Sequence, residues 1–243
     1  WNRIIILSEN ATIYEYDVYG NFKRMKILDK SLLWSIVSNS QGFLLSSNHL
    51  TYTSGENAFL FYYFDKDFHL KKKFFPVLPM QMYAPTGILN NISISEDRFV
   101  YNDVYTHKSY IFDDSTNIEA SYDFKFKNPM PTEMFSDTEI FIAKQFENDY
   151  LLDVVILHDK AISFYRQSNE SCIVEFDKNG KILHNSKYLG ILPNFLGSDG
   201  DCIFSALSAY ELLQTKDCGM LTDSSDSINP DSNSYIIKLK SKI

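Results

Sequence analysis

Apolar and polar residues alternate in short stretches along the whole chain, and several of these stretches end in an aspartate. The pattern is seen in "TIYEYD", "FLFYYFD", "SYIFDD" and "CIVEFD", each followed by polar or glycine residues and a second alternating stretch. Alternation with a period of two is typical of β-strands with one buried face. Aspartate followed by polar residues or by glycine, such as Gly20 and Gly180, is typical of tight turns. The pattern therefore predicts antiparallel hairpins.

The aspartates that open these turns recur at a regular interval. They are Asp17, Asp65, Asp113 and Asp177, which are 48, 48 and 64 residues apart. Repeats of about 40 to 50 residues are typical of the blades of a β-propeller. We expect the longer third interval to hold an extended hairpin within "TEIFIAKQFENDYLLDVVILHDKAISFYR", with "EIFIAKQF" as one of its strands.

These observations predict an all-β fold, a β-propeller with four antiparallel strands per blade, in a single domain over residues 1–243. Small sheets of this kind bury both faces only when they pack against their neighbours in a ring. We expect a first blade that is one strand short and a short helix at "SAYELLQ" in the last blade. The five blades are expected at residues 1–30, 31–80, 81–131, 132–190 and 191–243.

Composition and charge narrow the classes of partner. Aromatic residues make up 15% of the chain, which favours strands. A net charge of -8 opposes binding to a phosphate backbone, so we expect no nucleic-acid partner. The basic run at residues 71–73 is expected to be a solvated strand end. No stretch reaches the roughly 18 apolar residues of a membrane helix, and no membrane span is expected.

A resemblance covers essentially the whole chain. The segments "IYEYDVYGNFKRMKI", "SYIFDDSTNIEASYDFKFKNPMP", "GDCIFSALSAYELLQ" and "NPDSNSYIIKLK" resemble the six-bladed, NHL-like propellers of Bacteroides-type envelope lipoproteins, a group of unknown function. The resemblance implies five blades in this chain and six in the intact protein. It also implies a further blade and a lipid anchor upstream of Trp1, and a location in the periplasm or at the outer membrane. It brings no catalytic motif.

The cysteines and the turn sequences carry no strong signal for a metal or a cofactor. Cys172, Cys202 and Cys218 lack the spacing of a zinc site. We expect three buried free thiols, with a disulfide between Cys202 and Cys218 as the alternative. "DKNG" at 177 and "SDGD" at 198 have a faint likeness to calcium loops, but aspartate bonding to its own turn explains them. No metal and no cofactor are expected, because metalloprotease, nucleotide-binding and serine hydrolase motifs are missing too.

Two acids within apolar strands are the weak catalytic candidates. Asp103 lies in "FVYNDVYTH" and Asp153 in "YLLDVVILH". Two carboxylates facing the channel are what a carbohydrate hydrolase or lyase needs, one as the acid and one as the base or nucleophile. The simpler interpretation is a strand end or a salt bridge, for example to Arg98 or Arg166.

Strand alternation places Asp153 on one face with Leu151, Val155 and Leu157. An unpaired charge there would be costly. Asp153 is therefore expected to be paired, protonated or next to a solvent channel.

Four further residues are candidates for ligand binding. Tyr105 and His107 share a face with Asp103, and Tyr165 stands beside Arg166. Aromatic and hydrogen-bonding groups suit a sugar or a peptide at the mouth of a propeller. The leading interpretation is a non-enzymatic binding or interaction module with a small-molecule, glycan or peptide ligand at the central channel. The alternatives are the hydrolase or lyase, and a sensor or scaffold whose partner is another protein.

Overall fold

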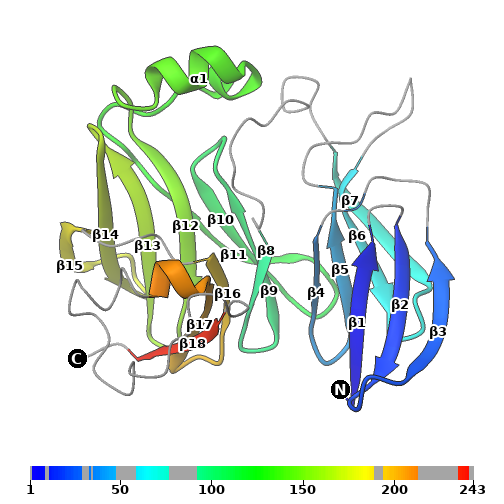
Figure 1. Cartoon of the computed structure of the whole chain (residues 1–243). Coiled ribbons are helices and arrows are strands. Elements are labelled where there is room, and N and C mark those ends of the chain that lie inside the picture. The colour runs from blue at the N-terminus through cyan, green and yellow to red at the C-terminus, as the bar shows by residue number, and fades with distance from the viewer. Residues whose placement is uncertain are drawn as a thin grey trace.

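The computed structural model describes residues 2–8, 11–28, 33, 35–47, 59–76, 92–188, 194–212 and 235–240. In these residues the strands form four sheets, and the seven-stranded one joins two antiparallel units through a parallel pair, β8 with β16 (Figure 1). We call the resulting five antiparallel units blades 1 to 5. Blade 1 contains β1 (Arg3–Ser8), β2 (Thr12–Asp17) and β3 (Phe22–Ile27). Blade 2 contains β4 (Ser35–Ser38), β5 (Gly42–Ser46), β6 (Phe59–Asp65) and β7 (Leu70–Pro76). Blade 3 contains β8 (Ile92–Ser95), β9 (Arg98–Asp103), β10 (Lys108–Phe112) and β11 (Ile118–Asp123).

Blade 4 contains β12 (Tyr150–Ile156), β13 (Lys160–Gln167), β14 (Glu170–Asp177) and β15 (Ile182–Lys187). Blade 5 contains β16 (Asn194–Ser198), β17 (Cys202–Leu207) and β18 (Tyr235–Lys240). The all-β propeller fold is confirmed, and in the described residues blade 1 has three strands, β1-β2-β3.

The core consists of apolar layers between successive blades. Ile13 and Phe43 belong to the layer between blades 1 and 2, and Phe61 and Phe99 to the layer between blades 2 and 3. The layer between blades 3 and 4 is built around Leu151, with Val100 and Ile111 from blade 3. A fourth layer, with Ile162 of blade 4 and Ile203 of blade 5, lies between blades 4 and 5. Blades 2, 3 and 4 therefore bury both faces against their neighbours, as a radial arrangement requires.

The four aspartates predicted to open turns all adopt the same geometry. In each turn the Oδ1 atom accepts hydrogen bonds from the backbone amides two and four residues further along, at 2.8 to 3.0 Å. Side-chain bonds from Asn21 to Asp17 and from Lys71 to Asp65, together with the backbone amide bonds in all four turns, stabilise the carboxylates and lower the pKa of each of the four side chains. The turns join β2 to β3, β6 to β7, β10 to β11 and β14 to β15. The repeat seen in the sequence is thus the repeat of this turn.

The third residue after each aspartate has a positive φ. Glycine is present at two of these positions, Gly20 with φ 85° and Gly180 with φ 80°. The other two positions carry Phe68 and Thr116, both with φ 60°. Phe68 is buried, and its ring stacks on Phe43 with centroids 4.4 Å apart. Side-chain burial offsets backbone strain there, which is why glycine is not needed in every turn.

The long third interval contains an antiparallel hairpin, β12–β13, but the strand expected at "EIFIAKQF" is wrong. Residues 132–144 instead form a 3-10 helix, η2 (Thr132–Ser136), and α1 (Thr138–Lys144). The Oδ1 atom of Asp137 accepts from the amides of Glu139 and Ile140 and so caps α1. "EIFIAKQF" is therefore helical, because a capping residue precedes it. Residues 209–212 are also helical, in agreement with the short helix predicted in the last blade.

Blades 3, 4 and 5 meet where their innermost strands end. β8 and β16 pair in parallel through Gly197 with Ile94 and through Ser198 with Ser95. The hydroxyl groups of Ser95 and Ser198 both donate to the carbonyl oxygen of Ile156, at 2.8 and 2.6 Å. This seam holds the inner edges of three blades together. Among the described helices, none combines the length and the apolar character that crossing a membrane requires.

Candidate functional site

Asp153 on β12 lies at the contact between blades 3 and 4. The side-chain amide of Asn102, on β9, donates to its Oδ1 atom, and the backbone amide of Val154 donates to the same atom at 2.8 Å. Ser109 Oγ donates to Asn102 Oδ1 and so fixes the orientation of the Asn102 amide. Burial raises the pKa of Asp153 to about 7, against the opposing effect of these bonds. The side chain is therefore hydrogen-bonded to a neighbouring blade, and its burial favours the neutral carboxyl group over the carboxylate.

Two expectations about Asp153 are wrong. A bulge between Leu151 and Asp153 shifts the register of β12. As a result Leu151 packs between blades 3 and 4, whereas Val155 and Leu157 pack between blades 4 and 5. Strand alternation could not reveal the extra residue.

The partner of Asp153 is also not an arginine. Arg98 pairs with Glu96 and Glu119, and Arg166 donates to Ser171 Oγ at 2.8 Å. Within the described residues, the side-chain partner of Asp153 is the neutral amide of Asn102.

Asp103 is the last residue of β9, and its side chain bonds to the turn that leads to β10. Its carboxylate accepts from the backbone amides of Tyr105 and Thr106 and from the Thr106 hydroxyl, the last at 2.7 Å. Burial raises its pKa in spite of these bonds. Successive residues of a strand point to opposite faces, so the side chain of Asp103 is directed away from the Asn102 amide that reaches Asp153. The structure does not bring the two carboxyl groups into one pair.

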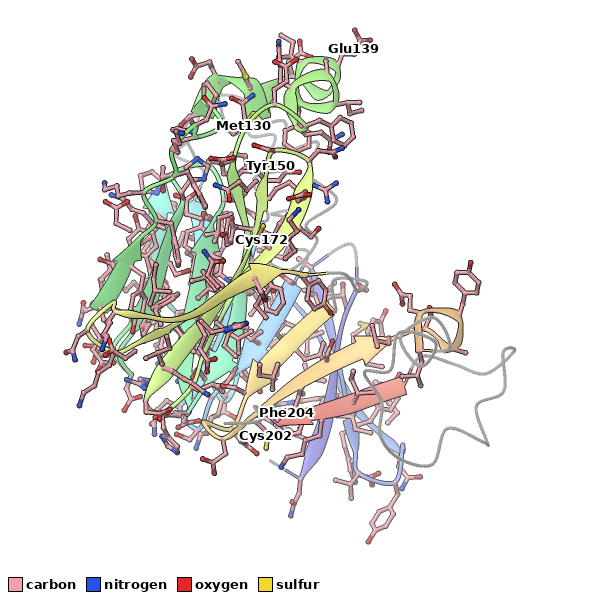
Figure 2. The ribbon with its side chains drawn as sticks, turned by 90° about the vertical axis from the view of Figure 1, so that its left-hand side faces the viewer. Met130, Glu139, Tyr150, Cys172, Cys202 and Phe204 are labelled. Atoms are coloured by element: carbon pink, nitrogen blue, oxygen red, sulfur yellow. The ribbon has the colours of Figure 1, made fainter. Side chains whose placement is uncertain are left out.

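Tyr105 and His107 belong to a buried cluster under the helical insertion. Tyr105 packs in an apolar cluster with Met130, Phe141 and Tyr150. Figure 2 shows Met130 and Tyr150 beside the helix that carries Glu139. A His107 ring nitrogen lies 3.3 Å from the Met130 carbonyl oxygen, and burial lowers the pKa of His107. Both residues hold the insertion onto blade 3.

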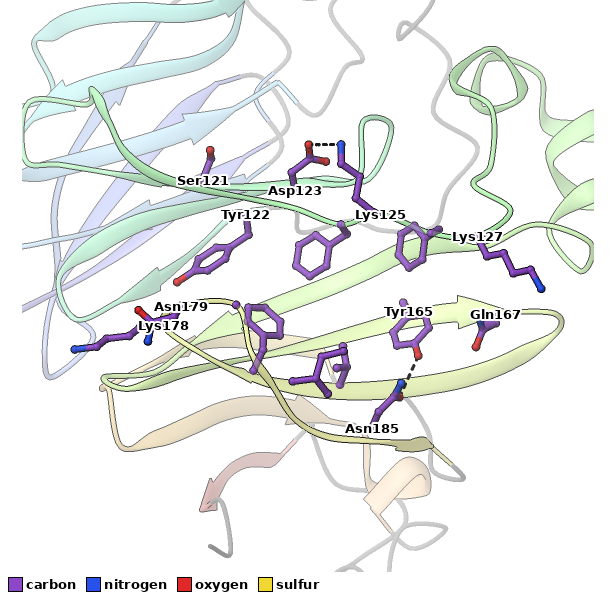
Figure 3. A pocket seen from close by; sticks show the side chains of 16 residues that line it. Ser121, Tyr122, Asp123, Lys125, Lys127, Tyr165, Gln167, Lys178, Asn179 and Asn185 are labelled. Atoms are coloured by element: carbon purple, nitrogen blue, oxygen red, sulfur yellow. Dashed lines mark hydrogen bonds and ion pairs between the residues drawn. The ribbon is translucent and has the colours of Figure 1, made fainter.

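Among the predicted ligand-binding residues, Tyr165 borders a large hollow. A groove of about 770 Å³ runs between β11, with the segment that follows it, and the face of blade 4 (Figure 3). The Tyr165 hydroxyl donates to Asn185 Oδ1 at 3.1 Å within this groove. Arg166, the next residue, is not among those that line it. We call this hollow the β11 groove.

The walls of the β11 groove are aromatic and apolar. Tyr122 and Phe124 each pack against Phe176, with ring centroids 5.5 and 5.7 Å apart, and Phe126 packs against Tyr165 at 5.6 Å. Val174 and Ile182 continue the apolar surface of blade 4, and Ile182 is 60% exposed. These residues are not among the predicted ligand-binding residues. For Tyr122, Phe124 and Phe126 a signal exists in the sequence, the alternation of aromatic and polar residues in "SYDFKFK".

Polar groups stand at the rim of the β11 groove. Gln167, Asn179 and Asn185 offer amide donors and acceptors, and Lys127 and Lys178 lie at its two ends (Figure 3). Such a surface combines apolar contact with hydrogen bonding and positive charge, as ligand sites commonly do. The hollow lies beside β11 and the face of blade 4, and a ligand at the central channel stays a prediction.

The two turns with a faint likeness to calcium loops are explained by local bonding. Asp177 accepts from the amides of Asn179 and Lys181, and Asp199 accepts from those of Asp201 and Cys202. Within the described residues no group of three or more His, Cys, Asp or Glu side chains is arranged to hold a metal. Cys172 and Cys202 are buried free thiols, and Cys218 lies outside the described residues.

Comparison with known protein families gives no match, and no curated protein matches the chain. Among solved structures, the chain is similar to a Bacteroides fragilis protein proposed to be exported, with a TM-score of 0.66 and 16% identity over 99% of this chain and 75% of that one. It aligns less well with the WD40 domain of Neurospora crassa Pan2, with a TM-score of 0.46 and 7% identity over 98% of this chain and 59% of that one. The Dos1 propeller aligns with a TM-score of 0.40 and 8% identity over 85% of this chain and 50% of that one. The likeness to the Bacteroides protein shows a shared fold, and the arrangement of the sheets makes that fold a β-propeller.

Proposed function

We propose that this propeller is a non-enzymatic ligand-binding module and that the β11 groove is its binding site. The observation that carries the proposal is the groove itself, about 770 Å³ in volume, with aromatic walls and amide groups at its rim. A volume of this size matches the range of known ligand sites, which is roughly 300 to 1,000 Å³. The ligand is an extended molecule, a glycan or a peptide, because the hollow is a long groove between two blades (Figure 3).

The proposed location is the bacterial cell envelope. It is supported by the likeness in fold to the Bacteroides fragilis protein proposed to be exported. Periplasmic or outer-membrane-anchored placement, a lipid anchor and a six-bladed ring remain predictions from the resemblance noted in the sequence.

The hydrolase or lyase alternative receives less support from the geometry. A glycosidase needs two carboxyl groups facing each other across the substrate. Asp103 is engaged in its own turn, and Asp153 is bonded to Asn102. The pKa of Asp153, about 7, would suit a general acid, but no second carboxylate is placed with it in the described residues.

Blocking the groove tests the proposal. In the variant Ile182→Trp an indole would enter the groove from an exposed position on β15, and folding should be little affected. Leu183→Trp is the matched control, because Leu183 is 53% exposed, adjacent, and not among the residues that line the groove. A glycan array and a displayed peptide library are screened first, and affinities for the hits are measured by calorimetry.

We expect Ile182→Trp to weaken binding by at least about tenfold, which is about 1.4 kcal/mol, and Leu183→Trp to leave it within about twofold. Equal affinity of both variants for every hit would place binding elsewhere on the propeller. The absence of any hit from either screen would count against a binding role for the groove.

A further inference from the structure

We propose that the ligand of the β11 groove is an extended peptide that adds to blade 3 as a further strand along the outer edge of β11. This inference rests on the proposed function, because it names the class of ligand and the way it binds at the same groove. Strand addition provides affinity through main-chain hydrogen bonds and selectivity through alternate side chains.

The outer edge of β11 is open in the described part of the chain. β11 is the terminal strand of its sheet and pairs with β10 alone. The backbone amide of Phe124 donates to the carbonyl oxygen of His107 on the β10 side. In an antiparallel pair the direction of the backbone groups alternates, so the N–H and C=O groups of Ser121 and Asp123 point outward. These groups form a row of donors and acceptors for a new strand.

The groove lies along this edge. Seven consecutive residues, 121–127, border it, whereas β13 and β14 contribute alternate residues of one face. Figure 3 shows the side chains of Ser121, Asp123 and Lys125 directed away from the groove, on the side opposite to Tyr122. Asp123 and Lys125 pair with each other there, at 2.6 Å. These three residues therefore meet the groove through their backbone.

β11 also lacks the protection found on two of the other outer strands. Lysine side chains on an edge strand discourage pairing with another chain. β3 has the sequence FKRMKI and β7 the sequence LKKKFFP, each with three basic residues, whereas β11 is IEASYD and has none. The charged residues of β11 are the acids Glu119 and Asp123, which pair with Arg98 and Lys125, so this edge lacks the lysines that most discourage strand addition.

The surroundings define the peptide that fits. A strand added beside β11 lies about 4.8 Å from it and directs every second side chain to one face. Side chains that face blade 4 meet Val174, Phe176 and Ile182, so apolar residues are favoured at alternate positions. Lys127 and Lys178 stand at opposite ends of the groove, and neither ammonium group has an ion-pair partner among the described residues. Acidic residues are therefore favoured toward the ends of the peptide.

A proline at an outward-facing position of β11 tests the strand edge separately from the rest of the groove. Ser121→Pro removes one outward N–H group and leaves the bonds to β10 in place, because proline is tolerated on the open side of an edge strand. Ser121→Ala keeps that N–H group and is the matched control. A phage-displayed library of random linear peptides is selected on the wild-type protein and on both variants, and thermal unfolding verifies that each variant is folded.

We expect enrichment of peptides with alternating apolar residues and acidic ends on the wild-type protein and on Ser121→Ala, and an affinity at least about tenfold lower for Ser121→Pro. The most enriched peptide is then synthesised with N-methyl groups on alternate amides, in the two complementary sets. Strand addition requires that one set abolishes binding and that the other leaves it within about threefold.

Three outcomes would overturn the inference. These are no enrichment on the wild-type protein, equal binding to Ser121→Pro, or equal tolerance of both N-methylated sets. Glycan binding that Ile182→Trp abolishes and Ser121→Pro does not would retain the groove as a binding site and reject the added strand. Failure of Ile182→Trp to affect any ligand would instead reject the groove, so the two proposals fail separately.

Discussion

Asn102 on blade 3 donates its side-chain amide to the carboxyl group of Asp153 on blade 4. Asn102 has no choice of orientation, because Ser109 donates to its carbonyl oxygen and the same amide also reaches the carbonyl oxygen of Val154 at 3.2 Å. The amide therefore presents its N–H groups to blade 4 and cannot accept a hydrogen bond from a protonated Asp153. A contact built for a carboxylate thus occurs where burial favours the neutral acid.

The first prediction concerns the pH dependence that this conflict creates. The pKa of Asp153 is about 7 in the folded protein and about 3.8 when the side chain is in water. The folded state consequently binds more protons than the unfolded state between these values, so stability falls as the pH rises from about 4 to about 7. Asp153→Asn removes this dependence and should gain about 2 to 3 kcal/mol relative to the wild type between pH 5 and pH 8.

Urea denaturation at pH 5 and pH 8 measures this difference. Asp67→Asn is the control, because the Asp67 side chain is 71% exposed and its removal should leave the difference between the two pH values unchanged. The same pH slope in the wild type and in Asp153→Asn would contradict the prediction.

The fold could be predicted from the sequence because its repeat is local. Each turn aspartate bonds to amides two and four residues away, so the turn depends on a few adjacent residues and appears at a fixed interval. The helical insertion differs from the predicted strand because a short apolar run, such as residues 140–143, fits a buried strand or a helix equally well, and the capping bond of Asp137 favours the helix. Local patterns therefore predict an element correctly where the turn residues and the apolar pattern indicate the same structure.

The candidate site could be predicted far less well because it depends on contacts between blades. The bulge at Asp153 shifts every later residue of β12, and nothing in "YLLDVVILH" marks it. Tyr165 was identified, but its groove is completed by Tyr122 and Phe124 from another blade. Only the ring arrangement brings these segments together, and the sequence specifies that arrangement through many weak apolar contacts rather than through a motif.

A second prediction concerns acid stability and the turn at Asp17. Hydrogen bonds from the Asn21 side chain and then from its backbone amide lower the pKa of Asp17 to about 2. A group with a lowered pKa contributes stability above its unfolded pKa, near 4, and the contribution is lost as the pH falls toward 2. Asp17→Asn keeps an oxygen acceptor but does not titrate, so its melting temperature should change less than that of the wild type between pH 4 and pH 2. Parallel curves measured by circular dichroism would show that the turn does not depend on the charge.

A third prediction concerns the seam between β8 and β16. A Cβ atom at Gly197 would lie 2.6 Å from the carbonyl oxygen of Ile94, which is backbone and cannot move aside. Gly197→Ala should therefore destabilise the protein by about 2 to 4 kcal/mol. At Gly180, by contrast, a Cβ atom meets nothing within 4 Å, and only the φ of +80° opposes it. Gly180→Ala should lower the free energy of unfolding by about 1 kcal/mol. Similar losses for both variants in urea denaturation would indicate that the backbone at the seam can shift to accept a Cβ atom.

The last prediction tests whether blade 1 is stabilised through one face. Ile13 on β2 is 1% exposed and packs with Phe43 and Phe64 of blade 2, whereas Ile6 on β1 is 50% exposed. Ile13→Ala removes the same atoms as Ile6→Ala but leaves a cavity between two blades, so it should cost about 3 kcal/mol against less than about 1 kcal/mol. Both free energies of unfolding come from urea denaturation of the full chain. Equal costs would mean that the apolar layer between blades 1 and 2 does not hold blade 1 in place, and the radial packing of that blade would have to be revised.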